Sequence, residues 1–198
     1  MTSPTKSPKK TGARTKQRLM DAMIKVVGSE GIQNASVRAI AREADCNEAV
    51  LYHHFENKHA MQEEVFSSLV LELAETRRAS ATNETDLGKF IRSWVESSYR
   101  FYDERPNAFS FVLLTFPPVM PIDHPVFTAN SDLFVACFRE ITPPPGSLLN
   151  LTDASFSAFR GLLLGPPRDI HLGKLAGPAT NFVDEIAALG TTLLLKPA

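Results

Sequence analysis

The 198-residue sequence predicts an all-α protein, and three observations support that prediction. Apolar residues recur at helical spacing in most of the long segments. No run of alternating β-branched residues joined by hairpin turns is present. Prolines, which interrupt helix interiors, are absent between Lys9 and Arg105, but from Pro106 onward they divide the chain into helix-length intervals.

The first eighty residues are expected to form a short arm followed by helices. Residues 1–13, rich in Lys, Ser, Thr and Pro, predict a disordered basic arm. A first helix is expected over about 14–29, where apolar side chains share one face. Ser36 and Asn47 have side chains that cap helix N-termini, so each is expected to open a short helix. A longer helix is expected over about 58–78.

The second half of the chain fits five more helices. Their expected ranges are about 84–103, 106–115, 125–141, 148–164 and 179–195. The last helix has an apolar face that is wide for a terminal helix, so this end of the chain is expected to expose more apolar surface than one chain covers.

Charge is unevenly distributed along the chain. Residues 1–60 contain ten Lys and Arg against six Asp and Glu, a net charge of +4, whereas residues 61–198 have a net charge of −5. A basic head on an acidic body is typical of a nucleic-acid binder with a second function elsewhere. The two cysteines indicate free thiols, and the polar N-terminal residues do not fit a secretory signal. The apolar runs are too short to span a bilayer, so a cytoplasmic location without a membrane partner is expected.

Residues 36–55, SVRAIAREADCNEAVLYHHF, fit two short helices joined by a tight turn at Asp45 and Cys46. Ala41 is small enough for the second helix to cross the first closely. The core between the two helices is expected to contain Val37, Ile40, Ala44, Cys46 and Leu51. In a helix-turn-helix, the second helix enters the major groove and the first crosses the DNA backbone. A generic helical hairpin is the alternative, but the small residue, the two caps and the basic context favour DNA binding.

Residues 15–65 resemble the N-terminal domain of the TetR family of transcriptional regulators. The resemblance lies in VGSEG at 27–31, SVRAIA at 36–41, LYHHF at 51–55 and Lys58. It implies a helix-turn-helix DNA-binding domain over 14–58 and a larger helical domain for effector binding and dimerisation over 59–198. It also implies a homodimer that represses from a palindromic operator in double-stranded DNA and is released by a small-molecule effector.

The resemblance implies DNA contacts residue by residue. Ser36 and Arg38 would meet phosphates at the start of the first motif helix. The second motif helix would present to the groove or its walls Asn47, Glu48, Ala49, Tyr52 and His53. Lys58 would meet a phosphate at the start of the next helix, and Tyr52 would also contact the backbone.

Two residues depart from the family pattern. Asp45 stands at the turn position where glycine is usual, and Asp tolerates left-handed geometry less well than glycine. Glu48 places an acid on the second motif helix, where it would repel phosphates but could accept a hydrogen bond from a cytosine amino group.

The second half is rich in aromatic residues, which suit an apolar ligand pocket between helices and suit an ordinary core as well. Because the resemblance implies an effector site there, we expect a small, largely apolar molecule to bind among the helices of about 87–165. The candidate wall residues are Trp94, Phe111, Phe134 and Phe159. Arg160 lies in an apolar stretch, where it could pair with a ligand carboxylate, with an acid across a dimer interface, or with solvent alone.

The last two predicted helices, over about 148–164 and 179–195, are expected to pair with their copies in a homodimer as a four-helix bundle. Much of that interface, or of the core just beneath it, is expected from Phe182, Ile186, Leu189 and Leu193.

Other classes of function find little support in the sequence. No catalytic constellation or phosphate-binding glycine loop is found, so neither an enzyme nor a cofactor is expected. His53, His54, His59 and Glu56 could suggest a metal site, but adjacent residues on a helix point about 100° apart, so no metal is expected. The remaining alternative is a helical small-molecule-binding protein whose helix-turn-helix has lost strong DNA affinity, for which Asp45 and Glu48 are the support.

Overall fold

The computed structural model describes residues 8–81, 83–114 and 125–198. The first half contains α1 (Pro8–Glu30), α2 (Val37–Glu43), α3 (Glu48–His54) and α4 (Lys58–Ala81). The second half contains α5 (Leu87–Glu104), α6 (Pro106–Phe109), the π-helix η1 (Ser110–Leu114), α7 (Pro125–Phe138), α8 (Asp153–His171), the 3₁₀-helix η2 (Ala179–Phe182) and α9 (Val183–Leu193). Two short strands, β1 (Ser147–Leu149) and β2 (Leu195–Pro197), pair antiparallel. The prediction of an all-α fold is therefore confirmed, with one small strand pair added.

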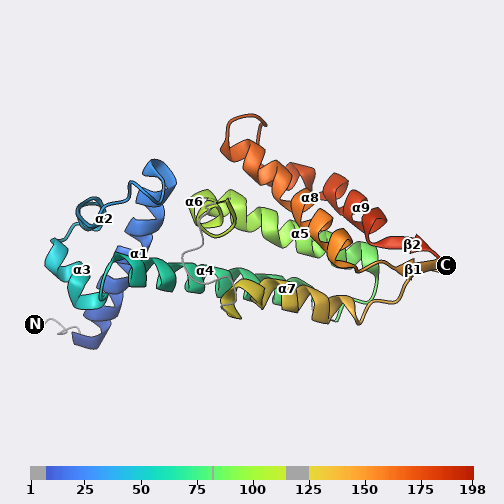
Figure 1. Cartoon of the computed structure of the whole chain (residues 1–198), viewed down its shortest axis with the longest axis horizontal. Helices are drawn as coiled ribbons and strands as arrows, with labels where there is room; N and C mark the ends of the chain where they lie inside the picture. Colours follow the sequence, from blue (N-terminus) through green and yellow to red (C-terminus); the bar gives the residue numbers. More distant parts are fainter. Residues whose placement is uncertain (1–7, 82, 115–124) are drawn as a thin grey trace, which may run out of the picture.

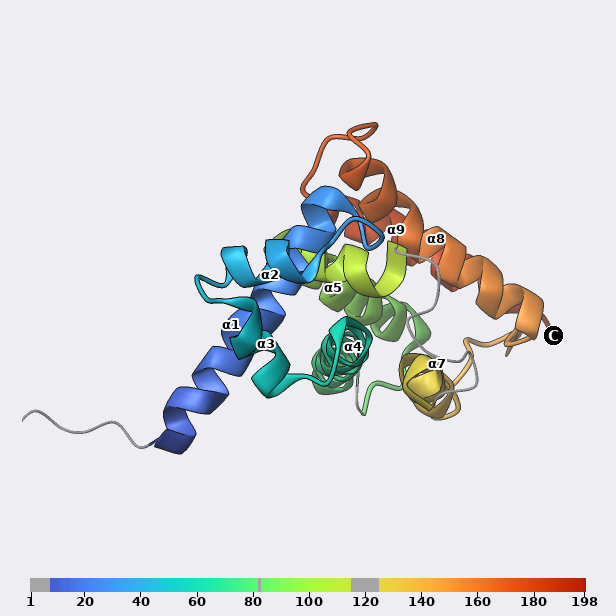
Figure 2. The ribbon, with the colours of Figure 1, turned by 60° about the vertical axis from the view of Figure 1, so that its left-hand side comes forward.

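The molecule is elongated, with α1–α3 at one end and α5–α9 forming the larger body at the other (Figure 1). Helix α4 runs from the small end into the body, where it packs between α5 and α7. Figure 2 shows α4 nearly end-on, with α7 beside it and α5 above. Because α4 borders both parts, any tilt of this helix changes how the two parts are oriented.

One continuous apolar core links the two parts of the molecule. At the small end, Leu19, Ile40 and Leu51 are fully buried. In the body, the ring of Phe134 lies 4.9 Å from that of Trp94 and 5.3 Å from that of Phe159, centroid to centroid. Part of the aromatic richness of the sequence therefore serves ordinary core packing. Within the described residues, no helix combines the length and the apolar character that crossing a membrane requires.

Two helices extend well beyond their predicted ends. Helix α1 begins at Pro8, so residues 8–13 are helical and the predicted disordered arm is wrong for them. Proline is favoured in the first helical turn, because its missing N–H has no helical partner there. Helix α8 continues through Pro166 and Pro167 to His171 instead of ending near residue 164. Pro167 is buried, and we attribute the continuation to this packing.

The β1–β2 pair replaces the predicted start of one helix and the predicted end of another. Gly146 has a φ of +76° and follows three consecutive prolines; with Pro145 it forms a turn before β1, in which the Ser147 N–H donates to the Pro144 carbonyl at 3.1 Å. Helix α8 begins later, at Asp153, because Thr152 caps it. The Thr152 side chain accepts a hydrogen bond from the Ser155 N–H, and the Ser155 hydroxyl accepts one from the Thr152 N–H.

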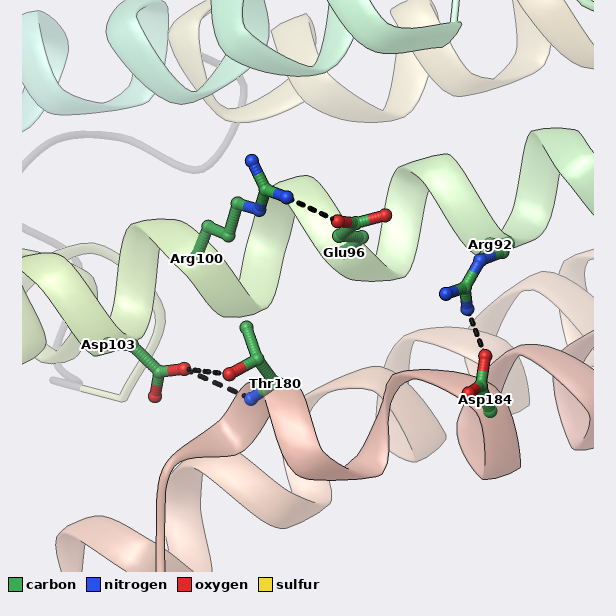
Figure 3. Close-up of polar contacts among 6 residues, drawn as sticks. All are labelled: Arg92, Glu96, Arg100, Asp103, Thr180 and Asp184. Atoms are coloured by element: carbon green, nitrogen blue, oxygen red, sulfur yellow. Dashed lines mark hydrogen bonds and ion pairs between the residues drawn. The ribbon is translucent and has the colours of Figure 1, made fainter.

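Polar contacts attach the last helical segment to α5 (Figure 3). The Asp103 carboxylate accepts hydrogen bonds from the backbone N–H groups of Ala179 and Thr180, at 2.7 and 3.0 Å, and from the Thr180 hydroxyl at 2.8 Å. Further along α5, Arg92 pairs with Asp184 of α9. The start of η2 is thereby satisfied by a side chain from another helix.

Candidate nucleic-acid interface and effector cavity

Helices α2 and α3 are joined by a tight turn and have the side-chain caps that the sequence predicts. The Ser36 hydroxyl accepts from the Ala39 N–H at 3.1 Å, and the Asn47 side chain accepts from the Val50 N–H at 3.0 Å. Asp45 adopts a φ of +51°, so the turn has left-handed geometry without glycine. The unit is therefore a helix-turn-helix in geometry as well as in sequence.

A contact that the sequence did not predict braces this turn. The Arg18 guanidinium, from α1, donates to the carbonyls of Ala44 and Asp45. These two carbonyls lie where α2 ends, so their hydrogen bonds to Arg18 hold the turn against α1. No motif marks Arg18, because its partners lie 26 and 27 residues further along the chain.

The exposed side chains of α3 and of its N-cap residue, which we call the recognition surface, are ones that the sequence predicted to face DNA. Its exposed members are Asn47, Glu48, Ala49, Tyr52 and His53. Tyr52 is 53% exposed, which is unusual for a large apolar side chain. Arg38, on α2, is exposed as well. An exposed aromatic residue beside exposed polar ones fits a surface that contacts a partner.

Lys58, at the start of α4, is half-buried and holds the motif to α4. Its ammonium donates to the carbonyl of Ala35, in the loop before α2, at 2.7 Å. His54, on the inner side of α3, is half-buried too, and burial together with His53 and Lys16 lowers the pKa of its imidazole. The described residues contain no group of three or more His, Cys, Asp or Glu side chains placed to hold a metal ion.

The body contains a cavity of about 160 Å³ between α4, α5, η1, α7 and α8. Most of its wall is apolar, formed by Phe66, Val70, Trp94, Val112, Leu113, Val126, Phe156, Phe159, Leu163 and Leu164. Its polar lining consists of Arg77, Asn130, Ser131 and Arg160. An apolar cavity with a few polar groups is the usual form of a small-molecule site.

Arg77 is the most unusual of these lining residues, because it is a charged side chain with only 4% of its surface exposed. Its Nε and Nη2 donate to the Ser98 hydroxyl at 3.2 and 3.0 Å, and its Nη1 donates to the Asn130 carbonyl oxygen at 2.8 Å. Its guanidinium carbon lies 4.9 Å from the centre of the Trp94 ring. Burial lowers the pKa of Arg77 to about 9, so the side chain still carries its charge at neutral pH.

The sequence predicted part of this lining. Trp94, Phe159 and Arg160 border the cavity, and Arg160 is exposed, with its guanidinium carbon 5.2 Å from the Phe156 ring centre. Phe134 lies behind the wall, packed on Trp94, and Phe111 lies towards α1 instead.

Arg77 was missed, although the sequence contained a signal for it. It follows Val70, Leu73 and Ala74 at helical spacing, so a charge interrupts the apolar face of α4.

A second connection between the cavity and the small end passes through α6 and η1. Val112 and Leu113 of η1 line the cavity. Asn107 of α6 packs so closely on Gly28 of α1 that a side chain at position 28 would overlap it. Together, η1 and α6 therefore connect the cavity wall to α1 by contacts that do not involve α4.

The residues predicted for a dimer interface differ in how far their side chains are exposed to solvent. Ile186 is buried at 7% exposure, Phe182 and Leu193 are half-buried, and Leu189 is 50% exposed. On α8, the outward side chains at successive turns are small: Ala154, Ser157, Ala158 and Gly161 are all exposed. Small outward side chains allow another helix to approach closely.

A helix-turn-helix on a helical body that contains a cavity defines the class of helix-turn-helix regulators. Residues 19–65 match the model of the bacterial regulatory proteins of the tetR family. The helix-turn-helix domain of the chain is therefore of the tetR type, as its motif resemblance indicated.

Known proteins of this class are similar to the chain in sequence or in fold. It is 28% identical over 99 residues to the HTH-type transcriptional repressor KstR2 of Rhodococcus jostii, and the alignment covers 50% of this chain and 48% of that protein. Its fold is similar to that of a TetR family transcription regulator from Marinobacter aquaeolei, with a TM-score of 0.79 at 17% identity, covering 95% and 99% of the two chains. It is also similar in fold to FadR from Bacillus subtilis in complex with stearoyl-CoA, with a TM-score of 0.61 at 11% identity, covering 90% and 98%.

Proposed function

We propose that the protein is a homodimeric transcriptional repressor that leaves a palindromic operator when a small, largely apolar effector occupies the cavity. The observation that carries this proposal is the course of α4. One end of this helix contributes Phe66, Val70 and Arg77 to the cavity, and the other end contributes Lys58, which bonds to the loop before α2. A repressor role is also the one that the name of the KstR2 relative states for that protein.

On DNA, α3 would enter the major groove with the recognition surface towards the bases and the groove walls. Ser36, Arg38, Tyr52 and Lys58 would contact phosphates. The test is operator binding measured as a function of salt, for which a protein that neutralises several phosphates shows a steep negative slope of log affinity against log salt. A flat slope would contradict this function.

A second candidate is a small-molecule-binding protein that has lost strong DNA affinity, and exposed Glu48 on the recognition surface favours it. The same salt measurement distinguishes the two candidates. A glutamate that reads a cytosine also makes a specific prediction: Glu48→Ala should raise affinity for nonspecific DNA while reducing discrimination between operator variants. If Glu48→Ala changes neither quantity, the acid does not face DNA.

The homodimer would form through the outward faces of α8 and α9, as a four-helix bundle. The exposed Leu189 and the small side chains of α8 support this arrangement. Light scattering at micromolar concentration should give a dimer for the unaltered chain and a monomer for Leu189→Lys. Leu71→Lys is a matched control, because Leu71 is 58% exposed but lies on α4. A monomer for the unaltered protein would overturn the arrangement.

Effector binding would act through the tilt of α4. Arg77 and Lys58 lie nineteen residues apart on this helix, which is about 28 Å at 1.5 Å per residue. A tilt of about 5° at the cavity would therefore displace the far end by about 2–3 Å. Two recognition helices must lie about 34 Å apart to read successive major grooves, so a shift of this size in both protomers weakens binding.

A further inference from the structure

The buried Arg77 has polar partners but no counter-charge in the part of the chain that the structure describes. Ser98 and Asn130 take three of its five N–H groups, and both are neutral. None of the ion pairs among the described residues includes it. One N–H on each of the two terminal nitrogens has no acceptor among these contacts. A bidentate carboxylate would accept from two such N–H groups, one on each nitrogen.

A buried charge without a counter-ion is costly, because the protein interior solvates it less well than water does. The hydrogen bonds of Arg77 join α4 to α5 and α7, but both partners are neutral, so these bonds do not themselves require a cation at this position. The neighbouring positions on the same face are Val70 and Ala74, and a methionine would fill a similar volume at position 77. The fold therefore carries a desolvated cation whose charge its described residues leave unmatched, at the edge of a cavity.

We propose that the effector is an anion, a carboxylate joined to a compact apolar body, and that Arg77 binds the carboxylate while the aromatic wall binds the apolar part. This inference rests on the proposed function, because it names the class of molecule that the cavity takes. Arginine presents a planar fork of donors that matches a carboxylate, and the surrounding apolar wall strengthens the attraction by excluding water.

The volume of the cavity limits the apolar body. A cavity of about 160 Å³ is similar to an engineered protein cavity of about 150 Å³ that binds benzene. One aromatic ring or a short aliphatic chain is therefore the expected size. Arg160, which lines the cavity and is exposed to solvent, adds a second positive charge there.

Trp94 makes this proposal testable without DNA. It is the only tryptophan of the chain, it lines the cavity, and its ring lies against the Arg77 guanidinium. A ligand that engages Arg77 should change its fluorescence. The full-length protein would be titrated with phenylacetate and with the neutral phenylacetamide, and then with the aliphatic pair hexanoate and hexanamide, while Trp94 emission is followed.

In the unaltered protein, at least one carboxylate should bind at least about tenfold more tightly than its amide. Arg77→Met should remove this preference while keeping the weaker affinity for the amide, and Arg77→Lys should retain part of it, since lysine keeps the charge but not the fork. Arg78→Met is the matched control: Arg78 is the next residue of α4, exposed and outside the cavity lining, so the preference should persist.

Three results would overturn the proposal. The first is equal affinity for acid and amide in the unaltered protein, a comparison that needs no variant to fold. The second is a carboxylate preference that survives Arg77→Met, or that is lost in Arg160→Met instead. The third is the absence of any binding by either acid at millimolar concentration. In each of these three cases, release of the operator by a neutral compound would still support the proposed repressor function. A flat slope of log DNA affinity against log salt would instead contradict that function, and the comparison of acid with amide would still be valid.

Discussion

The close packing of α9 on the cavity wall predicts that Gly190→Ala destabilises the protein. A Cβ at position 190 would lie 2.7 Å from Cε2 of Phe159 and 3.1 Å from Cγ2 of Ile91, both of which are fully buried. Optimal carbon–carbon contacts are about 3.5–4.0 Å, so the added methyl overlaps the Phe159 ring by nearly 1 Å. The Phe159 ring also lines the cavity, which offers space into which the ring can yield.

The expected magnitude is the difference between two effects. Overpacking of a buried site costs about 1–3 kcal/mol. Replacing glycine by alanine in a helix contributes about 0.5–1 kcal/mol in the opposite direction. A net loss of roughly 0–2.5 kcal/mol in the free energy of unfolding, centred on about 1 kcal/mol, is therefore expected. It lowers Tm by a few degrees at about 2–4 °C per kcal/mol for a chain of this length.

Thermal unfolding followed by circular dichroism, at one fixed protein concentration because the protein is proposed to dimerise, measures this change. Gly88→Ala is the control, since a Cβ there meets its nearest neighbour, Oδ1 of Asp86, at an ordinary 3.4 Å, and it should be neutral or slightly stabilising. If both variants raise Tm equally, α9 has room for a methyl group against the Phe159 ring and the reasoning is refuted. Gly190→Ala should also weaken effector binding more than DNA binding, because Phe159 moves into the cavity.

Three further variants test other parts of the molecule. Lys58→Ala should weaken binding to all DNA sequences alike and flatten the salt slope by roughly one. A lower Tm with an unchanged slope would show that Lys58 only stabilises the fold, through its hydrogen bond to the Ala35 carbonyl, and contacts no phosphate. Leu163→Trp should fill the cavity and reduce the effector response more than basal operator affinity, and an unchanged response would place the effector elsewhere. Asp103→Asn, which disturbs the three hydrogen bonds that attach η2, should lower the free energy of unfolding by about 1–2 kcal/mol, whereas Glu96→Gln in an exposed ion pair should cost about 0.5 kcal/mol or less.

The sequence predicted the helix-turn-helix closely because the signals that define it are local. The caps at Ser36 and Asn47 act on N–H groups three residues away, and the apolar spacing of α1 repeats within a single helix. Even the left-handed turn at Asp45 was marked by its position in the motif. The predicted DNA contacts of these residues stay predictions, since they depend on a partner that the chain alone does not contain.

The body was harder to predict because its boundaries depend on distant packing. Pro166 and Pro167 suggested the end of a helix, yet α8 continues through both. Position 148 fitted a helical pattern but pairs with Lys196 in the β1–β2 ladder, forty-eight residues away in the sequence. The burial of Arg77 involves Ser98 and Asn130, which are 21 and 53 residues away in the sequence.

The two connections between the cavity and the helix-turn-helix would transmit different displacements. Helix α4 is continuous from Arg77 to Lys58, so it transmits a tilt whose effect grows with distance. The other connection, through η1 and α6, acts at close range, because Asn107 packs directly on Gly28 and leaves no room for a side chain at position 28. A ligand anchored at Arg77 would pull on α4, whereas its apolar body would push on Val112 and Leu113 of η1, which line the cavity. An anionic head and an apolar body would then act on different connections, so a neutral analogue that fills the cavity but does not engage Arg77 should bind and yet release DNA incompletely. By reciprocity, operator DNA should weaken the binding of the complete anion more than that of the neutral analogue.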